Sequence, residues 1–240
     1  MKTTHFPGTI VCAMAILLAG LAVMSCRGTV PRRADAGSTV KEEMPGVTAP
    51  EDLMREHGVL RRVLLIYQET IRRIDANQQV PWAAVASCAD IVRRFVEDYH
   101  EKLEEDYIFP KFEAAGKLVD LTTTLRAQHK AGRALTDEIK RLSTPGRGAI
   151  KYPDSDKKLA DALRKFIAMY QVHAAREDTV LFPAIRDVVT PEEFDKMGDQ
   201  FEDKENELFG ERGFEKVVDQ VADIEKTLGI YDLNQFTPTP

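Results

Sequence analysis

Cysteine is scarce in this 240-residue chain, which contains only three. Cys12 lies within an apolar N-terminal stretch and Cys26 follows it, so Cys88 is the one thiol left in the body of the chain. A single thiol cannot form an internal disulfide, which excludes a disulfide-stapled scaffold. The fold must therefore be held by an apolar core or by bound metal, and we interpret Cys88 as a small buried hydrophobe.

Runs of basic residues are also missing. Lysine and arginine together number 33 against 39 aspartates and glutamates, which gives a formal net charge of −6. A protein that binds a nucleic-acid backbone needs clustered Lys and Arg to neutralise the phosphates. We therefore expect no nucleic-acid partner.

No hydrophobic run is long enough to cross a membrane comfortably. Residues 10–23 are almost wholly apolar, but a transmembrane helix needs about 20 such residues. Lys2 is the only charged residue before Arg27. A basic start, a short apolar core and small residues before a break are typical of a secretory signal. Residues 1–25 are therefore predicted to be a signal peptide, and the protein is predicted to be exported to the cell envelope or periplasm.

The end of this stretch, Val23-Met24-Ser25-Cys26, resembles the lipobox of bacterial lipoproteins, although Met24 is not the usual residue at its position. The resemblance implies cleavage before Cys26 and a lipid-linked Cys26 as the new N-terminus, anchored to the membrane. Stable attachment needs more than one acyl chain, which a diacylglyceryl cysteine provides. The alternative is a plain secretory signal that releases an unlipidated protein.

The rest of the chain divides into three regions. Residues 26–47 are rich in Gly, Pro, Ser and charge, and are predicted to be a flexible tether. In residues 48–189, apolar or His positions recur at helical spacing over four stretches: 53–74, 85–107, 118–142 and 159–184. Long helices with short connections predict an all-α, antiparallel up-down-up-down four-helix bundle. Residues 190–240 are predicted to add helices at about 191–209 and 214–228, packed outside the bundle, and an irregular tail.

The histidines show a doubled pattern. Four follow the signal, one on the apolar stripe of each predicted helix: His57, His100, His129 and His173. The first two are 43 residues apart and the last two 44. A glutamate, Glu104 or Glu177, follows the second histidine of each pair by four residues. The match extends to Phe-Pro, since HEKLEEDYIFP at 100–110 aligns with HAAREDTVLFP at 173–183. The bundle is thus interpreted as two copies of a helical hairpin.

This spacing favours metal binding. A His and a Glu four residues apart share one helical face, one turn from each other, and can reach neighbouring metal ions. Imidazole with carboxylate suits iron, manganese or zinc. The alternative is that each histidine is an ordinary core residue. Glu104 and Glu177 would then be buried carboxylates that need salt bridges, for which Arg133 or Arg176 could serve.

Residues 51–187 resemble the hemerythrin-like proteins that bind cations through a repeated His/His/Glu signature. The resemblance implies an oxo- or hydroxo-bridged pair of iron ions, with manganese or zinc less expected. It makes His57, His100, His129 and His173 terminal ligands, and Glu104 and Glu177 bridges. Oxygen-carrying hemerythrins have a second histidine where this chain has Arg133. The site should therefore have two histidines for each iron and an open position on each, which places reversible oxygen storage in doubt.

Three functions remain open from the sequence. The first is an envelope-anchored di-iron protein that binds or handles O2, NO or peroxide, or donates iron. The second is an enzyme with the same centre, a peroxidase or nitric oxide reductase. The third is a structural or zinc-binding interaction bundle. Three tyrosines, Tyr67, Tyr99 and Tyr170, are candidates to shape the pocket or donate to a bridging oxygen. Glu105 and Asp178 are expected to point toward solvent or a helix neighbour.

Overall fold

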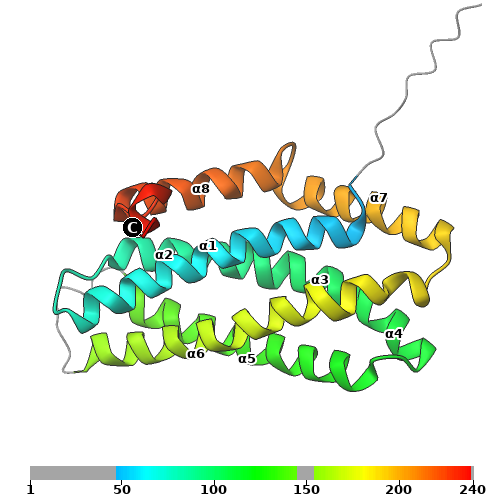
Figure 1. Ribbon diagram of the computed structural model, residues 1–240, viewed down its shortest axis with the longest axis horizontal. Helices are drawn as coiled ribbons and strands as arrows, with labels where there is room; N and C mark the ends of the chain where they lie inside the picture. Colours follow the sequence, from blue (N-terminus) through cyan, green and yellow to red (C-terminus); the bar gives the residue numbers. More distant parts are fainter. Residues whose placement is uncertain (1–46, 145–153, 239–240) are drawn as a thin grey trace, which may run out of the picture. The chain divides into compact units, whose positions relative to one another are not determined.

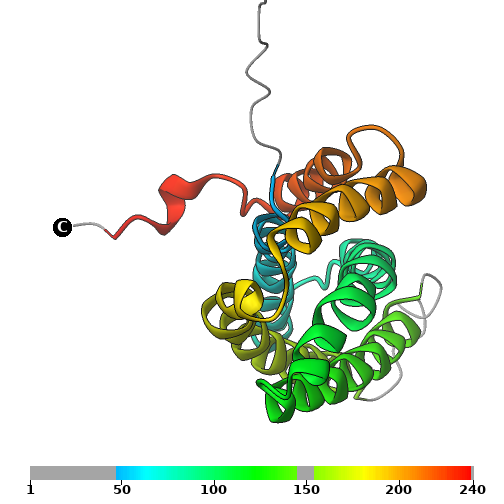
Figure 2. The same ribbon diagram turned by 90° about the vertical axis from the view of Figure 1, so that its right-hand side faces the viewer.

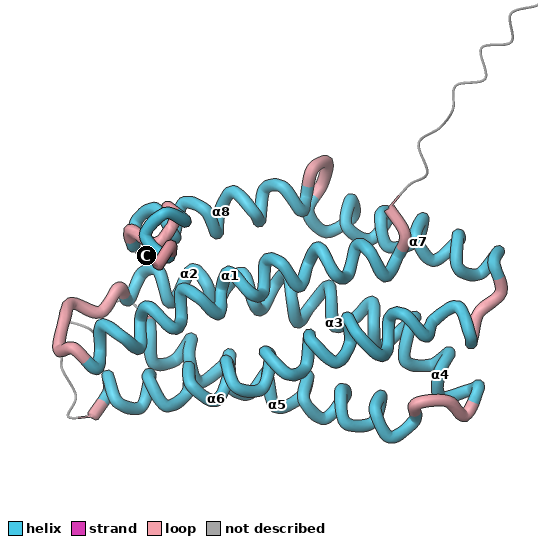
Figure 3. Tube along the Cα trace, viewed as in Figure 1, coloured by secondary structure: helices cyan, strands magenta, loops and turns pink. Residues whose placement is uncertain are grey.

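A computed structural model describes residues 47–144 and 154–238. The predicted signal peptide, the proposed lipidation site Cys26 and nearly all of the predicted tether lie outside these residues. Within the described ranges the helices are joined by loops, no β-strand occurs, and further short loops lie before α1 and in the C-terminal tail (Figure 3). None of the helices described is both long enough and apolar enough to span a bilayer.

Four helical segments pack side by side (Figures 1 and 2). The first is α1, Ala49–Asp75. The second is continuous through α2 (Trp82–Ile91), η1 (Val92–His100), α3 (Glu101–Leu103), η2 (Glu104–Ile108) and α4 (Phe109–Ala115). The third is α5, Val119–Ser143, and the fourth runs through α6 (Ser155–Arg176), η3 (Glu177–Leu181) and η4 (Phe182–Asp187). Consecutive segments run in opposite directions in Figure 1, and α1 and α5 each contact both the second and the fourth segment.

The helix starts follow from capping residues. The backbone N–H of Thr48 donates to the Glu51 carboxylate at 3.0 Å, and Pro50 fills a first-turn position that needs no N–H. At the start of α7, Glu193 N–H donates to the Thr190 hydroxyl at 3.2 Å while Thr190 N–H donates back to Glu193 at 2.9 Å. At both helix starts a threonine and a glutamate three residues later form a capping box.

Wider π-helical turns begin at Glu104 and at Glu177, where the sequence predicts ordinary helix. The N–H of Phe109 bonds to the Glu104 carbonyl five residues back, and Phe182 does the same to Glu177. The proline after each Phe has no N–H and cannot continue the regular ladder, which fits a local change of pitch. Such turns are frequent at functional sites, and here each contains a glutamate of the repeated motif.

The C-terminal region packs on the first half of the bundle. Helices α7 (Pro191–Phe209) and α8 (Gly213–Leu228) lie along α1 in Figure 1, and the described residues belong to one compact unit. The Phe209 ring meets Tyr99 edge-on at 5.4 Å, and Arg62 donates to Glu225 at 3.0 Å. The tail, expected to be irregular, contains the short 3₁₀ turn Leu233–Phe236, which the Asp232 carboxylate caps.

Candidate metal centre

Six side chains from the four helical segments converge at the middle of the bundle. They are the six of the repeated signature, and none is more than 3% exposed: His57, His100, Glu104, His129, His173 and Glu177. The Nε2 atoms of His57 and His100 lie 3.1 Å apart, and those of His129 and His173 lie 3.2 Å apart. Each half of the chain therefore contributes one pair of imidazoles that point at a common position.

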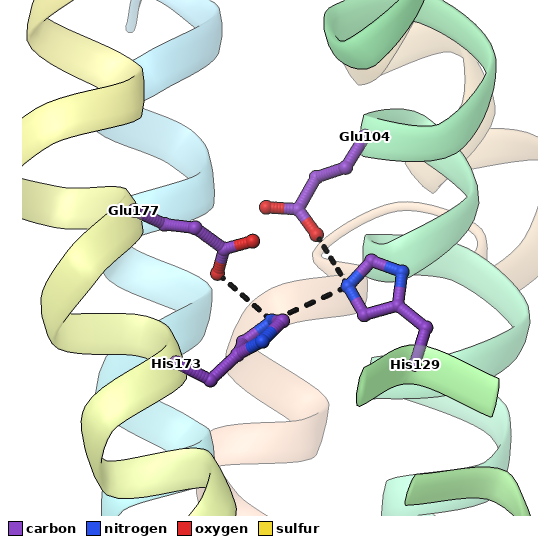
Figure 4. A group of neighbouring side chains, drawn as sticks. All are labelled: Glu104, His129, His173 and Glu177. Atoms are coloured by element: carbon purple, nitrogen blue, oxygen red, sulfur yellow. Dashed lines mark hydrogen bonds and ion pairs between the residues drawn. The ribbon is translucent and has the colours of Figure 1, made fainter. Parts of the chain in front are cut away.

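The two glutamates lie between these pairs. Glu104 faces His100 of the first pair at 3.7 Å and His129 of the second at 3.4 Å, through different oxygens. Glu177 faces His57 at 3.4 Å and His173 at 3.1 Å. Figure 4 shows the second pair with both glutamates turned toward it. A carboxylate placed between two groups of nitrogen ligands has the arrangement needed to bridge two metal ions.

The buried carboxylates fit a metal on chemical grounds. Glu104 and Glu177 are fully buried, and the polar neighbours of their oxygens are the site imidazoles described above, since no other described residue donates a hydrogen bond to them. A buried carboxylate is costly unless its charge is compensated, and metal coordination is a usual compensation. Nor do the arginines named in the alternative interpretation supply it, because Arg133 pairs with Glu101 and Glu105, and Arg176 is exposed. Nitrogen and oxygen donors of this kind suit iron, manganese or zinc.

The Nδ1 atom of each site imidazole contacts a polar side chain outside the six-residue centre. His57 contacts Asp178 at 2.7 Å and His129 contacts Glu105 at 3.0 Å. His100 and His173 have partners of their own, Glu56 at 2.6 Å and Gln128 at 2.9 Å. Such partners fix the ring so that Nε2 points inward, and a carboxylate partner also makes the imidazole a stronger ligand.

Sequence reasoning did not identify these four partners of the histidines. Glu105 and Asp178 were expected to point toward solvent or a helix neighbour, and they contact histidines on neighbouring helices of the other half of the bundle. Glu56 and Gln128 were not considered. The signal was present in the repeat, because each partner immediately precedes or follows a predicted ligand in both halves. The sequence did not show in which direction each of these side chains points.

The Phe-Pro element of the repeat also has a place in the site. Phe182 stacks on His57 with ring centroids 5.6 Å apart, and Phe109 stacks on His129 at 5.5 Å. Each phenylalanine thus covers an imidazole of the opposite half. The motif was recognised as part of the repeat, but its contact was not predicted.

Charge in the metal-free site is unevenly distributed. Burial opposes protonation of His57, but its contacts with Asp178 and Glu177 outweigh burial and raise its pKa to about 9. Burial lowers the pKa of His129 to about 4 despite the nearby Glu105. Burial and the charge of Glu177 raise the pKa of Glu104 well above its usual value. Metal binding requires neutral imidazoles and ionised carboxylates, so it would release protons from this site.

Arg133 and Tyr170 lie beside the centre. Arg133 donates to Glu105 at 2.8 Å and pairs with Glu101 at 2.8 Å. The Tyr170 hydroxyl donates to Glu101 at 2.7 Å, and its ring meets His173 edge-on at 5.5 Å. Gly132 makes this possible, because a Cβ there would lie 2.0 Å from the Tyr170 hydroxyl oxygen.

The other two tyrosines differ in position. Tyr99 is buried next to His100, and its pKa is raised by burial and by the charges of Glu56, Asp52 and Glu205, so its hydroxyl lies among carboxyl groups. Tyr67 packs edge-on against Phe166 at 5.5 Å. Among the described residues, no aromatic contact or hydrogen bond joins Tyr67 to the six central side chains. Cys88 is buried and free, as expected.

The core of this helical bundle contains groups of histidines and glutamates that could hold a metal ion. This arrangement is typical of a cation-binding protein. The model of the hemerythrin HHE cation-binding domain matches residues 48–185, and again residues 120–210. The chain belongs to this family. It is 53% identical over 221 residues to uncharacterized proteins from two strains of Mycobacterium tuberculosis and from Mycobacterium bovis, a match that covers 91% of this chain and 86% of each relative. No solved structure matches the chain.

Proposed function

We propose that the protein is an up-down-up-down, hemerythrin-like bundle that holds two iron ions and uses them to bind or handle O2, NO or peroxide. His57 and His100 would hold one iron, His129 and His173 the other, and the carboxylates of Glu104 and Glu177 would join the two. The observation that supports this most is the placement of two buried carboxylates between two imidazole pairs. An oxo or hydroxo bridge would complete the pair.

A small ligand fits the surroundings of this centre. A pocket of about 260 Å³ lies between α1 and α6, and its lining includes apolar side chains such as Leu60 and Leu64, polar ones such as Arg61, and Tyr170 and Ala174. Ala174 follows His173 directly, and the Tyr170 ring contacts that imidazole. The iron pair would supply the binding and redox chemistry for the small molecule. The chain would orient the imidazoles and keep bulk water away.

Membrane attachment is a second part of the proposal. We infer from the apolar stretch before Cys26 that the protein is exported and lipid-anchored through that cysteine. A Cys26→Ala variant should then move from the membrane fraction to the soluble fraction. Retention of that variant on the membrane would contradict the anchor.

Metal analysis and optical spectra test the iron centre. Purified full chain should contain about two iron ions, one for each imidazole pair. When the chain is loaded with iron anaerobically, its near-ultraviolet absorption should change on addition of O2, NO or peroxide. A chain purified with zinc or no metal, or an iron-loaded chain with no spectral response, would overturn the proposal. Glu177→Ala should lose most of the iron because this carboxylate faces both pairs. Glu113→Ala, an exposed residue far along the second segment, should keep it.

A further inference from the structure

Asp52, Glu56 and Glu205 form a second cluster of oxygen ligands, outside the six-residue centre. One carboxylate oxygen of each lies within 4.8 Å of the others. Asp52 and Glu56 are on one face of α1, and Glu205 comes from α7 in the C-terminal region. The cluster adjoins a pocket of about 390 Å³ whose lining includes Asp52 and Glu205.

Each of the three carboxylates is positioned by one of its oxygens and keeps the other available. The Asp52 carboxylate accepts from Arg55 at 3.2 Å, and Glu205 accepts from the backbone N–H of Phe214 at 2.7 Å. Glu56 accepts from His100 at 2.6 Å. The second oxygen of each accepts no hydrogen bond from any other residue that the structure describes.

Glu56 gives the independent indication of a ligand. The residue is 2% exposed, and its Oε1 atom is buried without a hydrogen-bond partner among the described residues. Burial raises the pKa of Glu56, and the buried Tyr99 hydroxyl lies close enough to oppose that rise, but it makes no hydrogen bond of good geometry with a described residue. Buried polar atoms are satisfied in the great majority of cases, so the Oε1 atom of Glu56 is available for a ligand.

The charge around the cluster favours a cation. Four acidic residues line the pocket, Asp52, Glu202, Glu205 and Glu215, against two basic ones, Arg55 and Arg212, and Glu56 lies behind them. Arg55 is turned partly aside, with its guanidinium stacked over the Phe214 ring at 4.4 Å. Burial and repulsion from Glu56 raise the pKa of Asp52 to about 7. A bound cation would remove this repulsion.

We propose that Asp52, Glu56 and Glu205 bind a divalent cation through oxygen ligands alone, at a site separate from the His/Glu centre. Carboxylate-only sites suit hard ions such as Mn²⁺, Mg²⁺ or Ca²⁺ rather than ions that prefer imidazole. Glu56 would be shared, because its Oε2 atom contacts His100 and its Oε1 atom, which has no hydrogen-bond partner among the described residues, would bind the cation. The C-terminal region thereby contributes a ligand and is more than a cover for the bundle.

Mn²⁺ binding to the iron-loaded full chain tests the site, with free Mn²⁺ followed by electron paramagnetic resonance. The wild type should bind one Mn²⁺ beyond its iron. Losing even an outer partner of a bound metal costs roughly 10–100-fold in affinity, so Glu205→Gln should weaken Mn²⁺ binding at least about tenfold. The amide keeps an oxygen for the Phe214 N–H, and unchanged helical circular dichroism would verify the fold.

Glu202→Gln is the matched control, because Glu202 is exposed and lines the same pocket but lies outside the cluster. It should change Mn²⁺ affinity by no more than about twofold. The site is overturned if no Mn²⁺ binds beyond the iron, if both variants weaken binding equally, or if anomalous scattering places the Mn²⁺ elsewhere. Iron content measured in the same samples judges the di-iron proposal separately, since Glu205→Gln should leave it unchanged.

Discussion

The two halves of the bundle supply the same central ligands but surround them differently. Each half offers two imidazoles, one glutamate at the start of a π turn, and a phenylalanine that stacks on a histidine of the other half. The partners behind the histidines differ. His100 is held by the carboxylate of Glu56, whereas its counterpart His173 is held by the neutral amide of Gln128.

A second difference concerns the arginines one turn after the first histidine of each half. Arg61 pairs with Asp178 at the surface, where its side chain is 50% exposed. Arg133 is 26% exposed and pairs with both Glu105 and the buried Glu101. In addition, α7 and α8 pack on α1 and so cover the first half. A repeat can therefore conserve its ligands while making the two metal positions inequivalent.

The largest expected effect comes from the arginines. Arg133→Met should destabilise the chain by about 3 kcal/mol, because it leaves the buried Glu101 carboxylate without its cation. Arg61→Met removes an exposed pair and should cost about 1 kcal/mol or less. Urea denaturation of both variants, followed by circular dichroism, measures the difference. Equal losses would show that the two halves are electrostatically alike.

The next effect concerns the side chains that contact the Nδ1 atoms of His100 and His173. Glu56→Gln gives both halves an amide partner and should weaken metal binding at the first pair by roughly 10–100-fold. Gln128→Glu gives both halves a carboxylate and should tighten binding at the second pair. Competition with a chelator measures both affinities. If Glu56→Gln left metal affinity unchanged, the contact at 2.6 Å would be structural only.

A third effect concerns pH in the metal-free chain and is spread over several pH units. His57 and His129 are counterparts, yet the pKa of the first is raised to about 9 and that of the second is lowered to about 4. Stability contributed by protonated His57 is fully present below pH 6.5 and is lost as pH rises through about 9, by about 1 kcal/mol per pH unit. Burial of neutral His129 instead costs stability as pH falls from 6.5 toward 4.

Nuclear magnetic resonance titration of the two imidazoles and urea midpoints across this range check the contrast. His57→Gln should remove the alkaline loss of stability, and His129→Gln the acid loss. Matching titration curves for the two rings would contradict the difference in their surroundings.

Much of the fold could be predicted from local pattern. The helical stripes, both capping boxes and the His–Glu spacing depend on residues within a turn or two of each other, and helices form where these were expected. The convergence of the six side chains was predicted because four histidines on four apolar stripes have little choice but to face one core. The π turns at Glu104 and Glu177 were not predicted, since they depend on how each proline is accommodated.

By itself, the sequence determined which residues could meet at the centre, because apolar periodicity decides which face of a helix is buried. Only the tertiary structure decided which side chains contact the Nδ1 atoms of the central histidines. Asp178 reaches His57 across more than a hundred residues, and Glu205 reaches the face of α1 that bears Glu56 only because α7 packs there. Such contacts join different helices, and their partners are chosen by packing angle and axial offset, which spacing along one helix does not encode.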